Sequence, residues 1–309
     1  MFQEINHKAM TELCNQNFVG AQKLLFENAK KNPCHETFNN LGYFLCTEGL
    51  FNNNDDRIRS ADVLGMKYLI KAVNIKLSVK NLCAVATAID LRITWKAKKK
   101  EDFCTYENAF KVMDKALQLQ YYDMLEYDKI RFLYLYNANN YIILESLRRL
   151  VKTYICEESV TFYLYVLCRH FCFEECLDAI KKYEKYIETA DLLNLYFLCG
   201  AYDKCASCFK PIIDGRYGLD EVGDSIMIEC LIKTGRFDEA EIYADYARGS
   251  ESDDEYHSKQ NCGKTAFDDL TESTEYRCNI IAKHKEDLFG RPRYITPCCY
   301  FGCVMHDDI

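Results

Sequence analysis

Hydrophobic and polar positions follow the period of an α-helix along most of the chain. In the stretch 38–51, Phe38, Leu41 and Leu45 mark one apolar helix face, and Gly42 lies in the middle of it. A glycine at such a position costs a helix about 1 kcal/mol relative to alanine. A favourable contact should offset that cost, so we expect a second helix backbone to pass close to Gly42.

A second pattern recurs along the chain: an aromatic residue, two mostly polar residues and a small residue open an amphipathic segment. The aromatic residues are Phe18, Tyr106, Phe173, Tyr202 and Phe237. The matching small residues are Ala21, Ala109, Cys176, Cys205 and Ala240, and weaker copies place Gly65 and Leu144 in this position. Once the insertions at 52–62 and 96–103 are set aside, the pattern returns about every 34 residues.

A helical hairpin of this length, with the aromatic-x-x-small pattern at the head of its second helix, resembles the tetratricopeptide repeat (TPR) family. Phe38, Leu41, Gly42 and Leu45 match the first-helix half of that family's motif. The resemblance implies an all-α fold, a TPR-like right-handed superhelix of about seven helical hairpins over residues 1–248. The small residues would then lie where paired helices approach most closely.

Two positions depart from the family pattern. Leu144 is bulky where a small residue is expected, so the fourth hairpin is the weakest match. Pro211 falls inside the second helix of the sixth hairpin. Because proline lacks a backbone N–H and clashes with the preceding turn, we expect that helix to end early or to kink.

The character of the chain changes after the last hairpin. Residues 249–265 are polar and predict a linker or loop. Residues 266–289 predict a helix, with acidic residues early and lysines late, that caps the open end of the last hairpin. Residues 290–309 form an irregular, cysteine-rich tail in this interpretation.

Composition limits the classes of binding partner and the cellular compartment that we expect for this protein. The net charge of −8 argues against sequence-independent binding of nucleic acid. No apolar stretch reaches the roughly 18 residues needed to cross a bilayer, and the first residues lack a signal-peptide pattern. Most of the 18 cysteines fall inside apolar helical patterns. We therefore expect reduced, buried thiols in a cytoplasmic protein that binds neither nucleic acid nor membrane.

Catalytic and cofactor motifs are weak. The tripeptide at 263–265, Gly-Lys-Thr, lacks the first glycine and the preceding strand of a phosphate-binding loop. The six histidines are scattered without a matching nucleophile motif. We expect a protein that is not an enzyme and that needs no cofactor.

Two cysteine groups have ligand types that suit a metal ion, although packing explains both more simply. The first is Cys298, Cys299, Cys303 and His306 in the tail, whose spacing fits no standard zinc motif. The second is Cys168, Cys172 and Cys176, with His170 between them, and Cys176 already occupies a small-residue position.

In the TPR family the first helix of each hairpin lines a concave groove, and this resemblance supplies the predicted binding residues. They are Asn39, Tyr43, Lys129, Tyr136, Thr161, Tyr165, Arg169, Asn194, Phe197 and Glu229. Tyrosines interleaved with amides suit an extended or helical peptide. Tyr165 and Arg169 lie four residues apart, and we expect their joint loss to abolish binding without changing the melting curve.

The resemblance thus implies a non-catalytic scaffold or adaptor that holds a protein or peptide in its groove. The sequence leaves open whether the protein forms homo-oligomers. Two alternatives also stay open: a regulator that responds to a peptide or small signal in the groove, and a metal- or redox-responsive protein that acts through the cysteine-rich tail.

Overall fold

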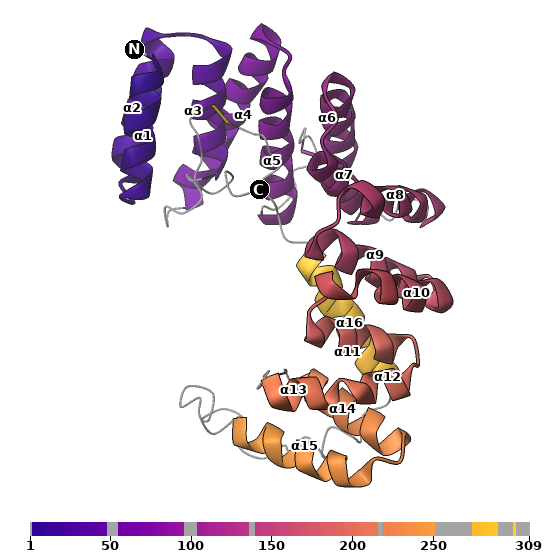
Figure 1. Cartoon of the computed structure of the whole chain (residues 1–309). Helices are drawn as coiled ribbons and strands as arrows, with labels where there is room; N and C mark the ends of the chain where they lie inside the picture. The colour runs from indigo at the N-terminus through magenta and orange to yellow at the C-terminus, as the bar shows by residue number, and fades with distance from the viewer. Residues whose placement is uncertain are drawn as a thin grey trace. The chain divides into compact units, whose positions relative to one another are not determined.

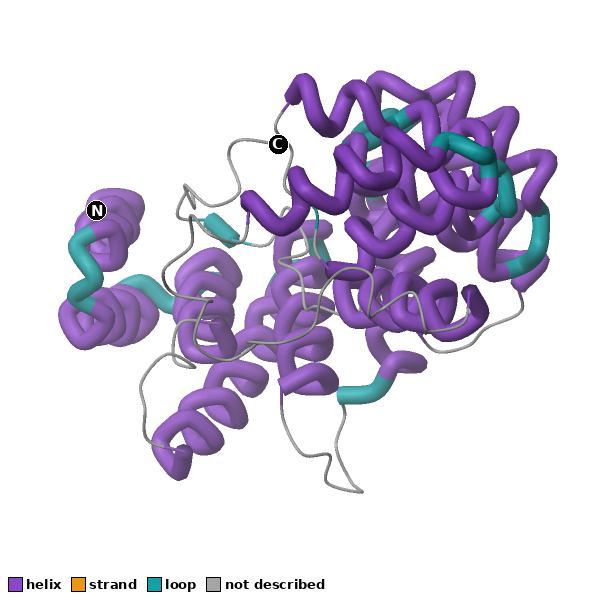
Figure 2. The backbone as a smooth tube through the Cα atoms, turned by 90° about the horizontal axis from the view of Figure 1, so that it is seen from below, coloured by secondary structure: helices purple, strands orange, loops and turns teal. Residues whose placement is uncertain are grey.

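The structure, a computed structural model, describes residues 2–47, 55–95, 104–135, 140–215, 219, 221–250, 274–289 and 299–300. Every regular element within these ranges is helical, and no strand occurs among them (Figure 2). The all-α prediction is confirmed for this part of the chain.

The chain divides into two compact units. Unit 1 combines Met1–Ala138 with Gly290–Ile309, and unit 2 is Asn139–Phe289. The sequence predicts one repeat domain over residues 1–248, whereas the compact units divide between Ala138 and Asn139.

The helices are labelled in chain order (Figure 1). Those of unit 1 are α1 (Phe2–Cys14), α2 (Phe18–Lys31), α3 (His35–Thr47), α4 (Asp55–Ile75), α5 (Val79–Trp95), α6 (Tyr106–Leu119) and α7 (Asp123–Leu135). Those of unit 2 are α8 (Asn140–Thr153), α9 (Glu157–Arg169), α10 (Phe173–Tyr183), the 3₁₀ helix η2 (Glu184–Tyr186), α11 (Thr189–Leu198), α12 (Tyr202–Ser207), α13 (Phe209–Gly215), α14 (Glu221–Lys233), α15 (Phe237–Ser250) and α16 (Thr274–Phe289).

The aromatic residues of the repeat pattern set the starts of helices. Each of the five is the first residue of a helix, and these helices are α2, α6, α10, α12 and α15. The five small residues that follow them are buried, with at most 3% of their surface exposed. The predicted positions of the second helices are therefore confirmed.

The turns before four of these helices share one geometry. The residue two before the aromatic has a positive φ: 58° at Gln16, 57° at Phe171, 68° at Gly200 and 73° at Gly235. The next residue then donates its backbone N–H five positions back, as Asn17 does to Glu12 (2.8 Å) and Arg236 does to Leu231 (2.8 Å). This is the helix-ending Schellman geometry, which favours glycine because it needs a left-handed residue.

Gly42 lies where the backbones of α3 and α4 almost touch. A Cβ atom added to it would come within 2.8 Å of the Gly65 carbonyl oxygen and of the Leu69 backbone nitrogen. A Cβ at Gly65 would likewise meet the Gly42 carbonyl oxygen at 2.8 Å. The predicted close approach at Gly42 is confirmed, and the contact explains how a mid-helix glycine is tolerated.

Pro211 interrupts the second helix of the sixth hairpin, as predicted. The helix that begins at Tyr202 ends at Ser207, four residues before the proline, and α13 continues from Phe209. The proline ring would clash with the carbonyl group of Ser207 in a continuous helix, so the chain breaks at that point.

The predicted capping helix exists over Thr274–Phe289, whereas residues 266–273 lie outside the described ranges. It packs on α14 of the last hairpin and also on α9 and α11 of the two hairpins before it. This placement bears directly on the predicted groove.

Candidate functional site

Three first helices of successive hairpins, α9, α11 and α14, contact one another in sequence order within unit 2. Helix α16 contacts all three, and Figure 1 shows it in yellow beside α9 and α11. We call the surface of α9, α11 and α14 that carries α16 the inner face. Two of the predicted groove residues, Tyr165 and Glu229, lie on this inner face.

One stripe of α16 faces this surface. Arg277, Ile281 and Phe289 are buried and Lys285 is half-buried, and the four recur at intervals of four residues. Residues four apart lie on the same side of a helix. The side chains of Glu275 and Lys283, outside the stripe, are exposed.

The N-terminal end of α16 is held by Glu229 of α14. Arg277 Nη2 lies 2.7 Å from Glu229 Oε2, with side chains only 5% and 8% exposed. Thr274 Oγ1 donates to Glu229 Oε1 (2.8 Å), and Lys233 Nζ lies 2.5 Å from the same oxygen. Burial alone would raise the pKa of Glu229, but the hydrogen bonds from Lys233 and Thr274 and the charge of Arg277 lower it.

The C-terminal half of α16 is held by an ion pair and an aromatic contact. Lys285 Nζ lies 2.6 Å from Asp191 Oδ1 of α11 and 4.9 Å from the centre of the Tyr165 ring of α9. The Tyr165 hydroxyl donates to Asp191 Oδ1 (3.2 Å). Burial, and then the adjacent Asp191 carboxylate, raise the pKa of Tyr165, so the hydroxyl keeps its proton as a donor.

Phe289 completes the contact at the last residue of α16. Its ring centre lies 4.6 Å from that of Phe162 and 6.4 Å from that of Tyr165, both on α9. The inner face thus offers two acidic sites and one aromatic site in a row, and α16 presents two cations and one aromatic ring at matching intervals.

The predicted groove residues of unit 2 separate into distinct groups. Tyr165 and Glu229 contact α16 directly. Thr161 is buried, Asn194 is half-buried and Arg169 is exposed.

Phe197 lies in the interior of its own hairpin. It is buried, and its ring packs against that of Tyr202 on α12, with the ring centres 6.0 Å apart. Its predicted place in the groove is therefore corrected: it is a core residue.

The predicted groove residues of unit 1 are not gathered on an open surface. Asn39 and Tyr43 are buried in α3. Lys129 Nζ forms an ion pair with Asp114 Oδ1 of α6 at 2.6 Å, which ties α7 to α6. Tyr136 lies outside the described residues.

Cys299 and Tyr300, two residues of the C-terminal tail, lie against α3. The Tyr300 backbone N–H donates to Asn40 Oδ1 (2.7 Å), and the Tyr300 hydroxyl lies 2.8 Å from Ser78 Oγ. Cys299 is buried in the apolar cluster that also contains Tyr43. Of the predicted metal ligands in the tail, Cys299 therefore packs in a core, and Cys298, Cys303 and His306 lie outside the described residues.

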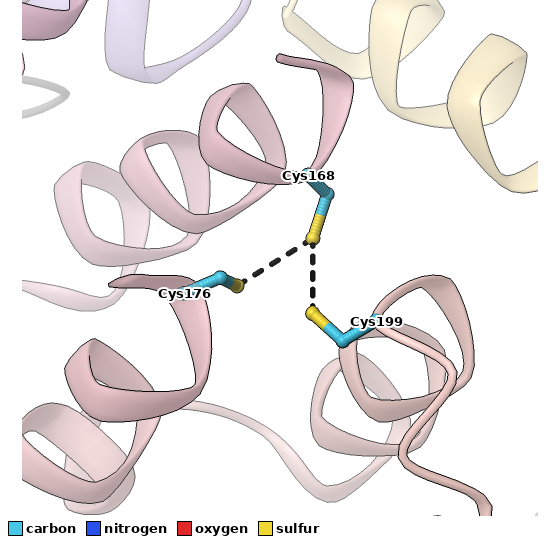
Figure 3. A group of neighbouring side chains, drawn as sticks. All are labelled: Cys168, Cys176 and Cys199. Atoms are coloured by element: carbon cyan, nitrogen blue, oxygen red, sulfur yellow. Dashed lines mark hydrogen bonds between the residues drawn. The ribbon is translucent and has the colours of Figure 1, made fainter. Parts of the chain in front are cut away.

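A different group of cysteines converges in unit 2, between the end of α9, the start of α10 and the end of α11 (Figure 3). Cys168 Sγ lies 3.5 Å from Cys176 Sγ and 3.7 Å from Cys199 Sγ. Hydrogen bonds from the Cys168 and Cys176 thiols lower the pKa of Cys199. The sequence pattern groups Cys172 with Cys168 and Cys176, but in the structure the third member of the group is Cys199. The Cys172 thiol lies 3.6 Å from the His170 carbonyl oxygen instead.

Several residues of the inner face are absent from the predicted set, namely Phe162, Asp191, Arg277, Lys285 and Phe289. The four-residue spacing of Arg277, Ile281, Lys285 and Phe289 was visible and could have marked a helix with one functional face. Asp191 carried no such signal, since it is one of several acidic residues near a predicted hairpin turn.

No model of a known protein family matches the sequence, and no curated protein matches it. Among the described helices, none combines the length and the apolar character needed to cross a membrane. We therefore infer function from the repeat pattern and from the geometry of the inner face.

Proposed function

We propose that the protein is a non-catalytic, TPR-like scaffold or adaptor that holds a helical segment of a partner protein on the inner face of unit 2. The carrying observation is that α16 lies on α9, α11 and α14 through the Arg277–Glu229 and Lys285–Asp191 ion pairs and the Phe289 ring. A face that holds one helix in this way provides the contacts for another.

The repeat family and its right-handed superhelix of about seven hairpins are part of this proposal. Five helices that begin at the repeated aromatic residue, together with the left-handed turn before four of them, support a succession of equivalent hairpins. A cytoplasmic location also belongs to the proposal, because the described cysteines are free thiols, as expected where cellular reductants keep them so.

The chemistry of the inner face defines the class of partner. It fits an amphipathic helix that carries a cation, an aliphatic side chain, a second cation and an aromatic ring at intervals of four residues. Buried aromatic and arginine side chains of this kind usually supply most of the binding energy at such surfaces.

Helix α16 acts in this scheme as a competitor attached to the same chain. A tethered segment has an effective concentration on the order of mM, so a partner must bind more tightly than α16 or act when α16 is weakened. The inner face then binds only partners whose affinity for it is higher than that of the attached α16.

A labelled synthetic peptide with the sequence of residues 274–289 tests the proposal by fluorescence anisotropy against the full chain. We expect it to bind the Lys285→Glu chain at least about tenfold more tightly than the wild-type chain, because the attached helix competes less in the variant. Lys283→Glu, the same change on the exposed side of α16, should behave as wild type.

A second peptide that carries Lys285→Glu should bind at least about tenfold more weakly than the first, because its carboxylate meets Asp191. The proposal is contradicted if the first peptide fails to bind the Lys285→Glu chain, or if both peptides bind it equally well.

A further inference from the structure

Three thiols from three separate elements meet in unit 2: Cys168 near the end of α9, Cys176 in the first turn of α10, and Cys199 after the end of α11 (Figure 3). Their sulfur atoms all lie within 4.8 Å of one another. Cys168 and Cys176 are buried, whereas Cys199 is half-buried and so gives the group a side that faces solvent.

The spacing suits three ligands of one ion. A thiolate lies about 2.3 Å from a zinc ion, so two thiolates on the same ion lie about 3.8–4.0 Å apart. The two observed separations of 3.5 and 3.7 Å are close to that value. Bringing the third pair into range needs a shift of about 1 Å or less, which rotation of the half-buried Cys199 side chain can supply.

We propose that Cys168, Cys176 and Cys199 form a binding site for one thiophilic metal ion, of the class that includes Cu(I) and Zn²⁺. Soft thiolate ligands select these ions over Mg²⁺ or Ca²⁺. Among the described residues the group has three members, which leaves a Zn²⁺ ion one further position for water and leaves Cu(I) a three-thiolate site. Each ligating thiol gives up its proton to the solvent as the ion binds.

The site joins two successive hairpins, because α9 and α10 form one and α11 begins the next. A bound ion therefore links the hairpins and stabilises the folded state by mass action. This role is separate from that of the inner face, since it uses none of the residues that hold α16.

Cys176→Ala is the decisive variant, and the protein supplies a matched control in Cys205→Ala. Both cysteines are fully buried in the small-residue position of their repeats, and both thiols lie near a backbone carbonyl oxygen, Leu164 at 3.7 Å and Leu193 at 3.6 Å. Alanine occupies the same position in three other repeats, so both variants should fold. Cys199→Ala, at a half-buried position, serves as a second test of the site.

The measurement is native mass spectrometry of full-length protein, reduced, stripped of metal and then titrated with Zn²⁺ alone or with Cu(I) alone. We expect Cys176→Ala and Cys199→Ala to bind one ion fewer than wild type, or to bind it at least about 100-fold more weakly, and Cys205→Ala to match wild type. The ion that binds more tightly identifies the metal. Equal binding by wild type and Cys176→Ala, or an equal loss in Cys176→Ala and Cys205→Ala, would overturn the proposal.

Discussion

Replacing Arg131 with methionine is expected to lower the free energy of unfolding of unit 1 by about 3–5 kcal/mol. Arg131 Nη2 lies 2.5 Å from Asp90 Oδ2, and Arg131 Nε lies 3.5 Å from Asp128 Oδ1. All three side chains are at most 2% exposed. Methionine fills similar space but leaves two carboxylates in the interior without the cation that offsets their desolvation.

Urea denaturation of the full chain measures this loss of stability, and two further variants serve as comparisons. Lys111→Met removes an exposed pair with Glu107 on α6 of the same unit and should change stability by less than about 1 kcal/mol. The triple variant Asp90→Leu, Asp128→Leu, Arg131→Met removes every charge of the cluster and should recover much of the loss. Similar losses for Arg131→Met and Lys111→Met would show that the cluster is solvated and that the burial assigned to it is wrong.

Tyr165→Ala is expected to destabilise unit 2 by about 3–5 kcal/mol. The Tyr165 side chain is 6% exposed and contacts three others. Its hydroxyl donates to Asp191, and its ring packs against the Lys285 ammonium group and the Phe289 ring. Alanine would remove the surface on which the C-terminal half of α16 lies and would leave a cavity beneath it. Differential scanning calorimetry of the full chain measures the change.

The companion variants separate the contributions of Tyr165. Arg169→Ala, at an exposed position one turn further on, should cost no more than about 0.5 kcal/mol. Tyr165→Phe keeps the ring and should cost about 1 kcal/mol through the lost hydrogen bond to Asp191. If Tyr165→Ala melts like wild type, the ring is not buried under α16 and the sequence expectation of an unchanged melting curve is correct after all.

The helices were predictable because their signals are local. An aromatic residue with a small residue three positions later fixed the start of α2, α6, α10, α12 and α15, and Pro211 fixed a break near Ser207. Gly42 pointed to a close helix contact because its local cost demanded one. Each of these inferences used residues within one or two turns of the feature it predicted.

The occupation of the inner face was not predictable in the same way. Tyr165 looked like an exposed binding residue because the predicted repeat phase places it outside its hairpin. What buries it is α16, which is far from it in the sequence, and no periodicity links Lys285 to Asp191 or Arg277 to Glu229. The thiol group is a similar case, since Cys199 joins Cys168 and Cys176 only when two hairpins pack together.

Amide hydrogen exchange across residues 274–289 tests the central claim, that α16 is bound to the inner face, most directly. Lys285→Glu places a carboxylate beside Asp191 and should speed exchange in α16 by at least about 30-fold, whereas Lys283→Glu on its exposed side should leave exchange within about threefold of wild type. Asp191→Lys combined with Lys285→Glu restores opposite charges and should recover most of the protection. Exchange in wild-type α16 as fast as in the free peptide, or equal acceleration by Lys285→Glu and Lys283→Glu, would contradict the account.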